Sequence, residues 1–194
     1  MSYDIYLRDQ IRGDVIRLAD PSICTGGFYC AHYDISSSTW STHPITDAWL
    51  KVTENYSDYY YEAAEGDERF IKPNQYNGRV ENVGIRGIYG EIAVESAEMI
   101  RDLINRIIEK YSDINGWKTT KRVTRIYYDS KGNEVDFRKN LFIKEKYTYE
   151  EFTTDVYEGP NANYWTATAA NAIVPLYQLL VFAKLRPDGI WDGS

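Results

Sequence analysis

The N-terminal part of the chain shows the two-residue alternation of half-buried β-strands. Segments 3–7 and 48–52 place an apolar residue at every second position, namely Tyr3, Ile5 and Leu7 in the first and Ala48, Leu50 and Val52 in the second. Gly13 lies between the first segment and an apolar segment at 15–18, as in a hairpin, and a third strand is predicted at 28–33. We therefore predict an antiparallel sheet in this half of the chain.

Three segments show the three- and four-residue spacing of helices. The most regular one covers 93–111, and a second covers 171–185, where Pro175 is compatible with a first helical turn. The third is a short stripe made of Tyr56, Tyr59, Tyr60, Ala63 and Ala64. This stripe is compatible with packing on the sheet, while Tyr61 falls on the opposite, acidic face. The sequence leaves open how much of the tyrosine cluster is exposed.

A polar segment lies between the helices predicted at 93–111 and 171–185. Residues up to Tyr128 favour β-structure, 129–133 provide a turn, and the hairpin expected at 118–137 is polar enough to protrude. Segment 146–159 alternates weakly and adds a further strand candidate. We predict a single α+β domain over 1–194, in which two amphipathic helices pack on an antiparallel sheet and an inserted hairpin subdomain occupies 117–158.

Charge is distributed unevenly along an acidic chain. The formal net charge is −7 and the pI is near 4.9, which argues against general binding to nucleic-acid backbones. Acidic residues cluster at 54–68 with no base among them, and basic residues cluster at 118–125 with no acid. One acidic and one basic face are therefore expected. Direct nucleic-acid contact by the basic strand, with tyrosines stacking on bases, is the weaker alternative.

Candidate chemistry in the sequence is sparse. Cys24, Cys30, His32 and His43 do not have zinc-finger spacing, and a reactive pair of Cys30 with His32 is less expected than an ordinary buried thiol. The segment GIRGIYG at 84–90 precedes a helix and includes Arg86, but it matches no phosphate-binding fingerprint, so tight packing turns are favoured over an anion site. We expect no catalytic residue, no cofactor and no metal.

Membrane insertion is not expected either. No run of 18 apolar residues occurs, and the first ten residues, MSYDIYLRDQ, lack a secretory signal. The two cysteines form no disulfide framework. These features predict a cytosolic location.

The chain resembles a family of small acidic proteins encoded by bacteriophages, prophages and related mobile elements. The resemblance rests on MSYDIYLRD at the start, GIRGIYG in the middle, and NYWTATAANA with LLVFAKLRPDGIWDG at the end. It covers about two thirds of the chain and leaves 117–158 as a lineage-specific insertion. The resemblance implies a setting in a host bacterial cytosol and an anti-defence role, such as that of anti-CRISPR proteins.

The leading hypothesis is a non-enzymatic protein that inhibits a bacterial defence protein, such as an RNA-guided nuclease. Such nucleases hold nucleic acid in basic channels, where an acidic, tyrosine-rich surface can compete. The predicted partner contacts are Glu54, Tyr56, Asp58, Tyr61, Glu62, Glu65, Asp67 and Glu68, and the predicted secondary contacts are Lys118, Lys121, Arg122 and Arg125. The alternatives are a small-molecule or nucleotide-binding enzyme that uses GIRGIYG, and a phage structural or regulatory protein that assembles with itself through Trp49, Trp165 or Trp191.

Overall fold

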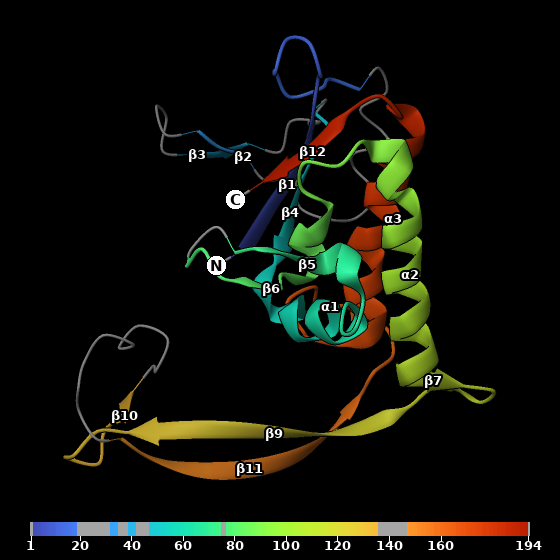
Figure 1. The fold of residues 1–194 in the computed structure, drawn as a ribbon. Coiled ribbons are helices and arrows are strands. Elements are labelled where there is room, and N and C mark those ends of the chain that lie inside the picture. Colours follow the sequence, from blue (N-terminus) through green and yellow to red (C-terminus); the bar gives the residue numbers. More distant parts are fainter. Residues whose placement is uncertain are drawn as a thin grey trace.

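The computed structural model describes residues 2–18, 32–34, 39–41, 47–74, 77–135 and 147–193. The fold is α+β, as the sequence predicts (Figure 1). Of the cysteine and histidine candidates, Cys24, Cys30 and His43 lie outside the described residues, as does most of the strand predicted at 28–33. The last part of that strand is present as β2 (His32–Asp34), which pairs with β3 (Thr39–Ser41).

The central sheet is antiparallel and joins the two ends of the described chain. Its strand order is β12 (Ile190–Gly193), β1 (Ser2–Arg8) and β4 (Trp49–Thr53). The predicted alternation is confirmed, because every second residue of β1 from Tyr3 to Leu7 is buried. The second arm of the predicted N-terminal hairpin forms only isolated bridges, at Val15 with Arg8 and at Arg17 with Asp47.

Two long helices pack side by side against this sheet (Figure 1). Helix α2 (Ala93–Tyr111) matches the predicted segment, and its apolar side is buried from Ala93 to Ile107. Helix α3 (Ala169–Leu185) begins earlier than predicted, because the side chain of Thr168 caps it by accepting from the Asn171 backbone N–H at 3.2 Å. Pro175 therefore lies in the second turn of α3 and not in the first.

Short elements connect β4 to α2. The helical ones are η2 (Glu54–Tyr56), α1 (Ser57–Ala63), η3 (Glu68–Phe70) and η4 (Gly84–Ile88). The strands are β5 (Ile71–Pro73) and β6 (Val80–Asn82), which pair with each other. Helix α1 packs on α2, so the short tyrosine-rich segment lies directly beside the core.

A β-arm extends away from these layers (Figure 1). After α2, the hairpin of β7 (Ser112–Asp113) and β8 (Gly116–Trp117) leads into β9 (Thr119–Tyr128). The turn at 129–133 then returns the chain to β10 (Glu134–Val135), which confirms the predicted hairpin. The main partner of β9 is however β11 (Thr148–Tyr157), whose ten residues pair antiparallel with all of β9. We call the sheet β10-β9-β11 the β-arm.

Candidate functional site

The tyrosine stripe of α1 belongs to the core. Tyr56, Tyr59 and Tyr60 are all buried, which confirms the helical spacing that the sequence shows. The Tyr60 hydroxyl donates to the carbonyl of Ala172 at 2.9 Å, and the Tyr56 hydroxyl donates to the carbonyl of Tyr164. Burial raises the pKa of all three phenols. Tyr56, one of the predicted partner contacts, is thus fully covered within the chain, and the structure gives its side chain a packing role.

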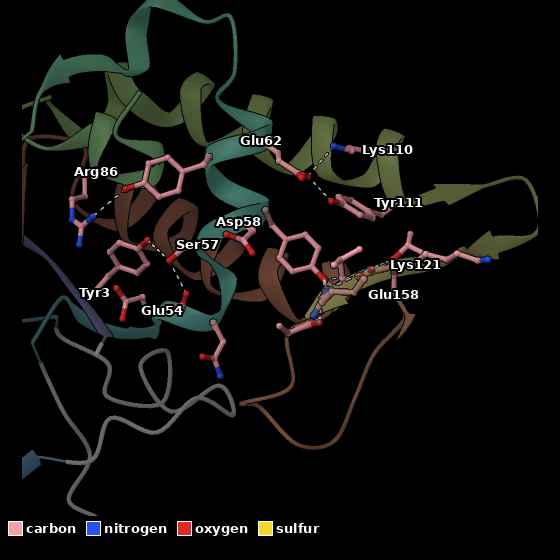
Figure 2. Close-up of a pocket in the computed structure, with 17 residues that line it drawn as sticks. Tyr3, Glu54, Ser57, Asp58, Glu62, Arg86, Lys110, Tyr111, Lys121 and Glu158 are labelled. Carbon is pink, nitrogen blue, oxygen red and sulfur yellow. Dashed lines mark hydrogen bonds and ion pairs between the residues drawn. The ribbon is translucent and has the colours of Figure 1, made fainter. Parts of the chain in front are cut away.

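The opposite side of α1 forms one wall of a cleft of about 820 Å³ at the base of the β-arm (Figure 2). Asp58, Tyr61 and Glu62 come from α1, and Glu54 comes from the turn before it. The arm supplies the facing wall. The remaining lining residues are Tyr3, Asn55, Ser57, Tyr59, Arg86, Lys110, Tyr111, Thr120, Lys121, Arg122, Val123, Glu158 and Ala167.

At one end of the cleft a guanidinium group lies on aromatic rings. Arg86 is 4.5 Å from the centroid of the Tyr3 ring and donates a long hydrogen bond of 3.5 Å to the Tyr61 hydroxyl. Tyr3 and Ser57 share a hydrogen bond of 2.6 Å between their hydroxyls. A cation stacked on an aromatic face is stabilised by the negative potential of the ring. Arg86 therefore forms part of the cleft wall, in contact with Tyr3 and Tyr61.

At the other end, α2 supplies the partners of an acidic side chain. Lys110 donates to Glu62 at 2.8 Å, and the Tyr111 hydroxyl donates to the same carboxylate oxygen. Partial burial opposes ionisation of Glu62, but these hydrogen bonds outweigh it and lower the pKa of the carboxyl group. Burial and the contact with Glu62 raise the pKa of Tyr111. The charge of Glu62 is thus already balanced within the chain.

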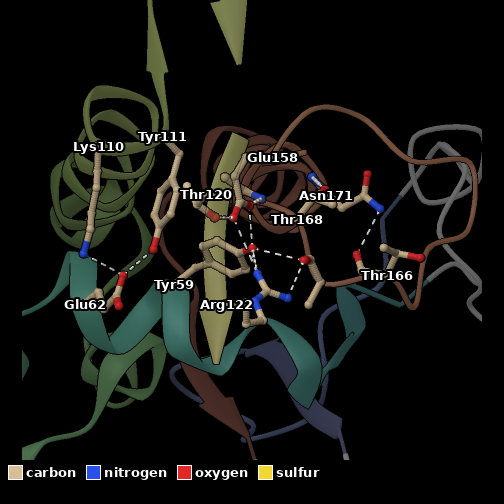
Figure 3. A network of polar contacts seen from close by, with 12 residues as sticks. Tyr59, Glu62, Lys110, Tyr111, Thr120, Arg122, Glu158, Thr166, Thr168 and Asn171 are labelled. Carbon is tan, nitrogen blue, oxygen red and sulfur yellow. Dashed lines mark hydrogen bonds and ion pairs between the residues drawn. The ribbon is translucent and has the colours of Figure 1, made fainter. Parts of the chain in front are cut away.

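The base of the β-arm is held by a buried carboxylate, Glu158 (Figure 3). Its Oε2 accepts from the Tyr59 hydroxyl at 2.6 Å and from the Ala169 backbone N–H at 2.9 Å. Its Oε1 accepts from the Thr120 hydroxyl at 2.6 Å and lies 3.6 Å from Nη2 of Arg122. A buried charge is tolerated when it is paired and its oxygens are hydrogen-bonded. The Glu158 cluster therefore joins α1, α3 and the arm.

The loop between the arm and α3 is fixed by a second group of polar contacts (Figure 3). The buried Asn171 side chain donates to the carbonyls of Asn161, Asn163 and Thr166 at 3.1 to 3.3 Å. Arg122 donates to the carbonyl of Ala167 at 2.9 Å and also contacts the Tyr59 hydroxyl. These contacts make the cleft wall a defined surface, since its loop is tied to the helix on one side and to the arm on the other.

The predicted acidic face is divided between the cleft and other places. Glu54, Asp58, Tyr61 and Glu62 line the cleft, whereas Glu65 and Glu68 are exposed beyond α1. Asp67 forms ion pairs with Arg69 at 2.6 Å and with Arg106 at 2.9 Å. The hydrogen bonds from Arg69 lower the pKa of Asp67 well below its usual range. The acidic run in the sequence is therefore partly neutralised, because α2 brings Arg106 and Lys110 against it.

The predicted basic face is also neutralised in part. Arg122 is committed to the Glu158 cluster, and Arg125 forms an ion pair with Glu151 of β11 at 2.7 Å. Lys118 donates to the carbonyl of Lys110, and Lys121 lies opposite Asp155 in the sheet register. Strand pairing thus places acids beside a strand whose sequence is purely basic, and the expected basic face is not formed as one continuous surface.

The glycine segment 84–90 is a packing element. It forms the buried 3₁₀ helix η4, and a Cβ at Gly87 would lie 2.4 Å from the Phe70 ring. The first N–H groups of α2 donate elsewhere, with Ala93 bonded to the carbonyl of Gly189 at 2.8 Å. The N–H groups of Ala93 and Val94 at this helix start are therefore engaged within the chain, and the buried packing of η4 agrees with the interpretation as tight packing turns.

The sequence pattern does not predict that several lining residues share one site. Tyr3, Arg86, Thr120 and Glu158 come from four distant segments, and no spacing rule connects them. The residues that the structure describes contain no group of three or more His, Cys, Asp or Glu side chains arranged to hold a metal ion. The cleft instead combines tyrosine hydroxyls with charges of both signs, which suits recognition of a charged partner surface.

No described helix is long and apolar enough to cross a membrane. No protein-family model, no curated protein and no solved structure matches the chain. Its function is therefore argued from the cleft and the β-arm themselves.

Proposed function

We propose that this chain is a non-enzymatic binding protein that holds a partner protein with its β-arm and the cleft at the arm's base. The observation that carries this proposal is the arm itself. Tyr149, Phe152 and Tyr157 of β11 have exposed fractions of 54%, 44% and 58%, and Val123 of β9 is similarly exposed. Exposed aromatic and aliphatic side chains on a projecting element are typical of a surface that a partner covers.

The charge of the molecule favours a basic partner. The chain has a net charge of −7, and the cleft contains Asp58, which lies between its two ends (Figure 2). An acidic surface accelerates encounter with a basic one and favours it over acidic competitors. The rigid tyrosine Tyr61 beside Asp58 adds contact area at low entropic cost.

Among basic partners, a bacterial defence nuclease is the one that fits the resemblance to proteins of mobile elements. An RNA-guided nuclease has a positively charged channel for its nucleic acids. In this proposal the chain occupies that channel, with the cleft and the arm as contact surfaces, and acts in the cytosol of the host bacterium. Inhibition then needs surface complementarity and no catalytic group.

The test is a pull-down with the tagged chain from lysate of the bacterium that carries the element, followed by mass spectrometry and a cleavage assay of the captured protein. Stoichiometric capture of a nuclease or its ribonucleoprotein, together with loss of its cleavage activity, supports the proposal. Capture without inhibition, or recovery of the chain alone, contradicts it.

Two sets of substitutions locate the contact surface. Asp58→Lys tests the cleft, and Phe152→Ser with Tyr149→Ser tests the arm; we expect each to weaken binding at least tenfold. Glu95→Lys is the matched control, because this exposed residue lies on the N-terminal part of α2, whereas the cleft contacts α2 at Lys110 and Tyr111. Asp67 and Glu62 are unsuitable for charge reversal, since both form ion pairs within the fold.

Self-assembly is a weaker alternative. Trp191 is buried, and its indole N–H donates to the Ser96 hydroxyl at 2.7 Å, so it is not available for a contact between copies. Trp165 is exposed. Light scattering over a range of concentrations distinguishes the two cases: assembly through Trp165 raises the measured mass with concentration, whereas a protein that binds another partner stays a monomer.

A further inference from the structure

The outer edge of β11 carries an inference that deepens the proposed function. Among the described residues the strand order of the β-arm is β10, β9 and β11, so β11 has β9 on one side and no strand on the other. A strand edge of this kind presents unpaired N–H and C=O groups at every second residue. We propose that this edge docks an extended, basic segment of the partner protein, which adds to the arm as a further strand.

The edge lacks most of the features that keep other sheet edges free of partners. Proteins protect edge strands with short length, charged side chains (above all lysine), proline or bulges. Of these features β11 has only acidic side chains, which disfavour an acidic strand and favour a basic one. β11 is ten residues long, pairs with β9 without interruption from Thr148 to Tyr157, and contains no lysine and no proline. Its exposed side chains include Tyr149 and Phe152. A long, regular edge with exposed aromatic side chains is suited to strand addition, in which the backbone provides affinity and alternate side chains provide specificity.

The charge of β11 selects the occupant. The strand contains Glu150, Glu151 and Asp155 and no basic residue. Glu151 is paired with Arg125, whereas Glu150 and Asp155 form no ion pair with any residue that the structure describes. Glu150 and Asp155 are five residues apart, so they project from opposite faces of the arm. An added strand with lysine or arginine at alternating positions would place cations on one face, beside one of these two carboxylates.

The inner neighbour of β11 shows what kind of strand it accepts. β9 is basic, with Lys121 opposite Asp155 and Arg125 opposite Glu151 in the register. An added strand of similar composition would repeat this pairing on the outer side. A second copy fits less well, because two β11 edges paired together would bring Glu150 and Asp155 of each copy onto neighbouring strands, and the added strand would supply no basic residue.

The test uses a synthetic peptide of about ten residues that alternates lysine with threonine and valine and has blocked ends. The control peptide has the same sequence with N-methyl groups at all central backbone positions, so it keeps the charge and loses the hydrogen-bond donors of both edges. We expect the first peptide to bind at least tenfold more tightly and to slow hydrogen exchange of β11 amides. Equal binding of the two peptides would show charge attraction alone and overturn the proposal.

Occupation of the edge by a second copy has its own signature. In that case the free protein elutes as a dimer, the β11 amides are protected before any peptide is added, and the peptide does not bind. That result would also overturn the proposal. A monomer with exchanging β11 amides is the expected state.

Two neighbouring proline variants test the edge within the protein. Thr153 and Thr154 direct their N–H groups to opposite sides of β11, so Thr153→Pro and Thr154→Pro separate the outer edge from the pairing with β9. The variant whose β9 amides stay protected is the edge variant, and it should lose peptide binding at least tenfold. If it binds the peptide as the unmodified protein does, the edge is not the docking site.

The same variant separates this inference from the proposed function. Capture of the nuclease by the edge variant at full yield would leave the binding function intact and refute docking at β11. Peptide binding without nuclease capture by the unmodified protein would refute the proposed partner and leave the edge site intact.

Discussion

The hydroxyl of Tyr59 donates a 2.6 Å hydrogen bond to the carboxylate of Glu158, which lies 99 residues further along the chain. Tyr59 belongs to the buried stripe of α1, and Glu158 directly follows the last strand of the β-arm. This contact makes the position of the arm depend on the core, because the same carboxylate also accepts from Thr120 at the start of β9. The two walls of the cleft therefore meet at a single buried group.

Removal of the Glu158 carboxylate is expected to destabilise the fold and loosen the arm. In Glu158→Ala the Tyr59 and Thr120 hydroxyls and the Ala169 N–H lose their acceptor, and Arg122 loses its counter-charge. We expect a loss of about 2–4 kcal/mol in the free energy of unfolding, measured in urea. Glu158→Gln keeps the shape of the side chain and one acceptor oxygen. Its free energy of unfolding should therefore lie between those of the unmodified protein and Glu158→Ala.

The control for this prediction is Glu151→Ala. Its ion pair with Arg125 is exposed on the arm, so its loss should cost less than about 1 kcal/mol. A Glu158→Ala variant as stable as Glu151→Ala, with unchanged hydrogen exchange at β9, would show that the Glu158 cluster does not anchor the arm.

Tyr60→Phe should destabilise the protein by about 1 kcal/mol, because one buried hydrogen bond to the carbonyl of Ala172 is lost while the ring is kept. Tyr177→Phe is the matched control, since Tyr177 is exposed on α3. Chemical denaturation of the two variants measures the difference. Equal free energies of unfolding for the two variants would mean that the buried Tyr60 hydroxyl makes no net contribution to stability.

Gly87→Ala should cost about 1–3 kcal/mol, because the new methyl group would overlap the Phe70 ring at 2.4 Å and approach its Cα at 3.1 Å. The same substitution in a Phe70→Leu background should cost less, since the overlapping ring atom is gone. Thermal unfolding of the four proteins of this cycle gives the coupling energy. Additive effects would indicate that the two residues do not compete for space.

We expect the free energy of unfolding to depend on the ionisation of Asp67 at acidic pH. Hydrogen bonds and ion pairs with Arg69 and Arg106 lower the pKa of Asp67 below the ordinary value of 3.8, so folding favours the ionised form. Its contribution is complete above pH 3.8 and is lost as the pH falls from there through the lower pKa of the folded state. The stability difference between the unmodified protein and Asp67→Asn should therefore be constant near neutral pH and shrink below about pH 4.

Urea midpoints at a series of pH values measure this dependence. Glu65→Gln serves as the comparison, because Glu65 is exposed and forms no ion pair with any described residue. A difference between the unmodified protein and Asp67→Asn that stays constant down to pH 3 would contradict the assigned ion pairs.

Local periodicity was sufficient to predict the regular elements. Each of these elements buries one side, so its apolar residues recur at a fixed short spacing along the chain. This spacing is visible in β1, β4, α1 and α2. Strand β12 was not predicted, since it is short and its pairing with β1 joins opposite ends of the sequence. Strand β11 lies within the strand candidate at 146–159, where the alternation is weak because almost all of the strand is exposed.

The sequence by itself thus determined the α+β class, the helical spacing of the tyrosine stripe and the hairpin with its turn at 129–133, because these depend on spacing along the chain. The burial of the tyrosines was left open and is decided by the packing of α1. Only the tertiary structure decided which charges remain available. Glu62 and Asp67 look like a partner-binding surface in sequence, but α2 brings Lys110 and Arg106 to them. Glu158 gave no signal at all, although it joins the arm to the core. Electrostatic and hydrogen-bonding partners are chosen by distance in space, and residues far apart in sequence become neighbours only when the layers pack.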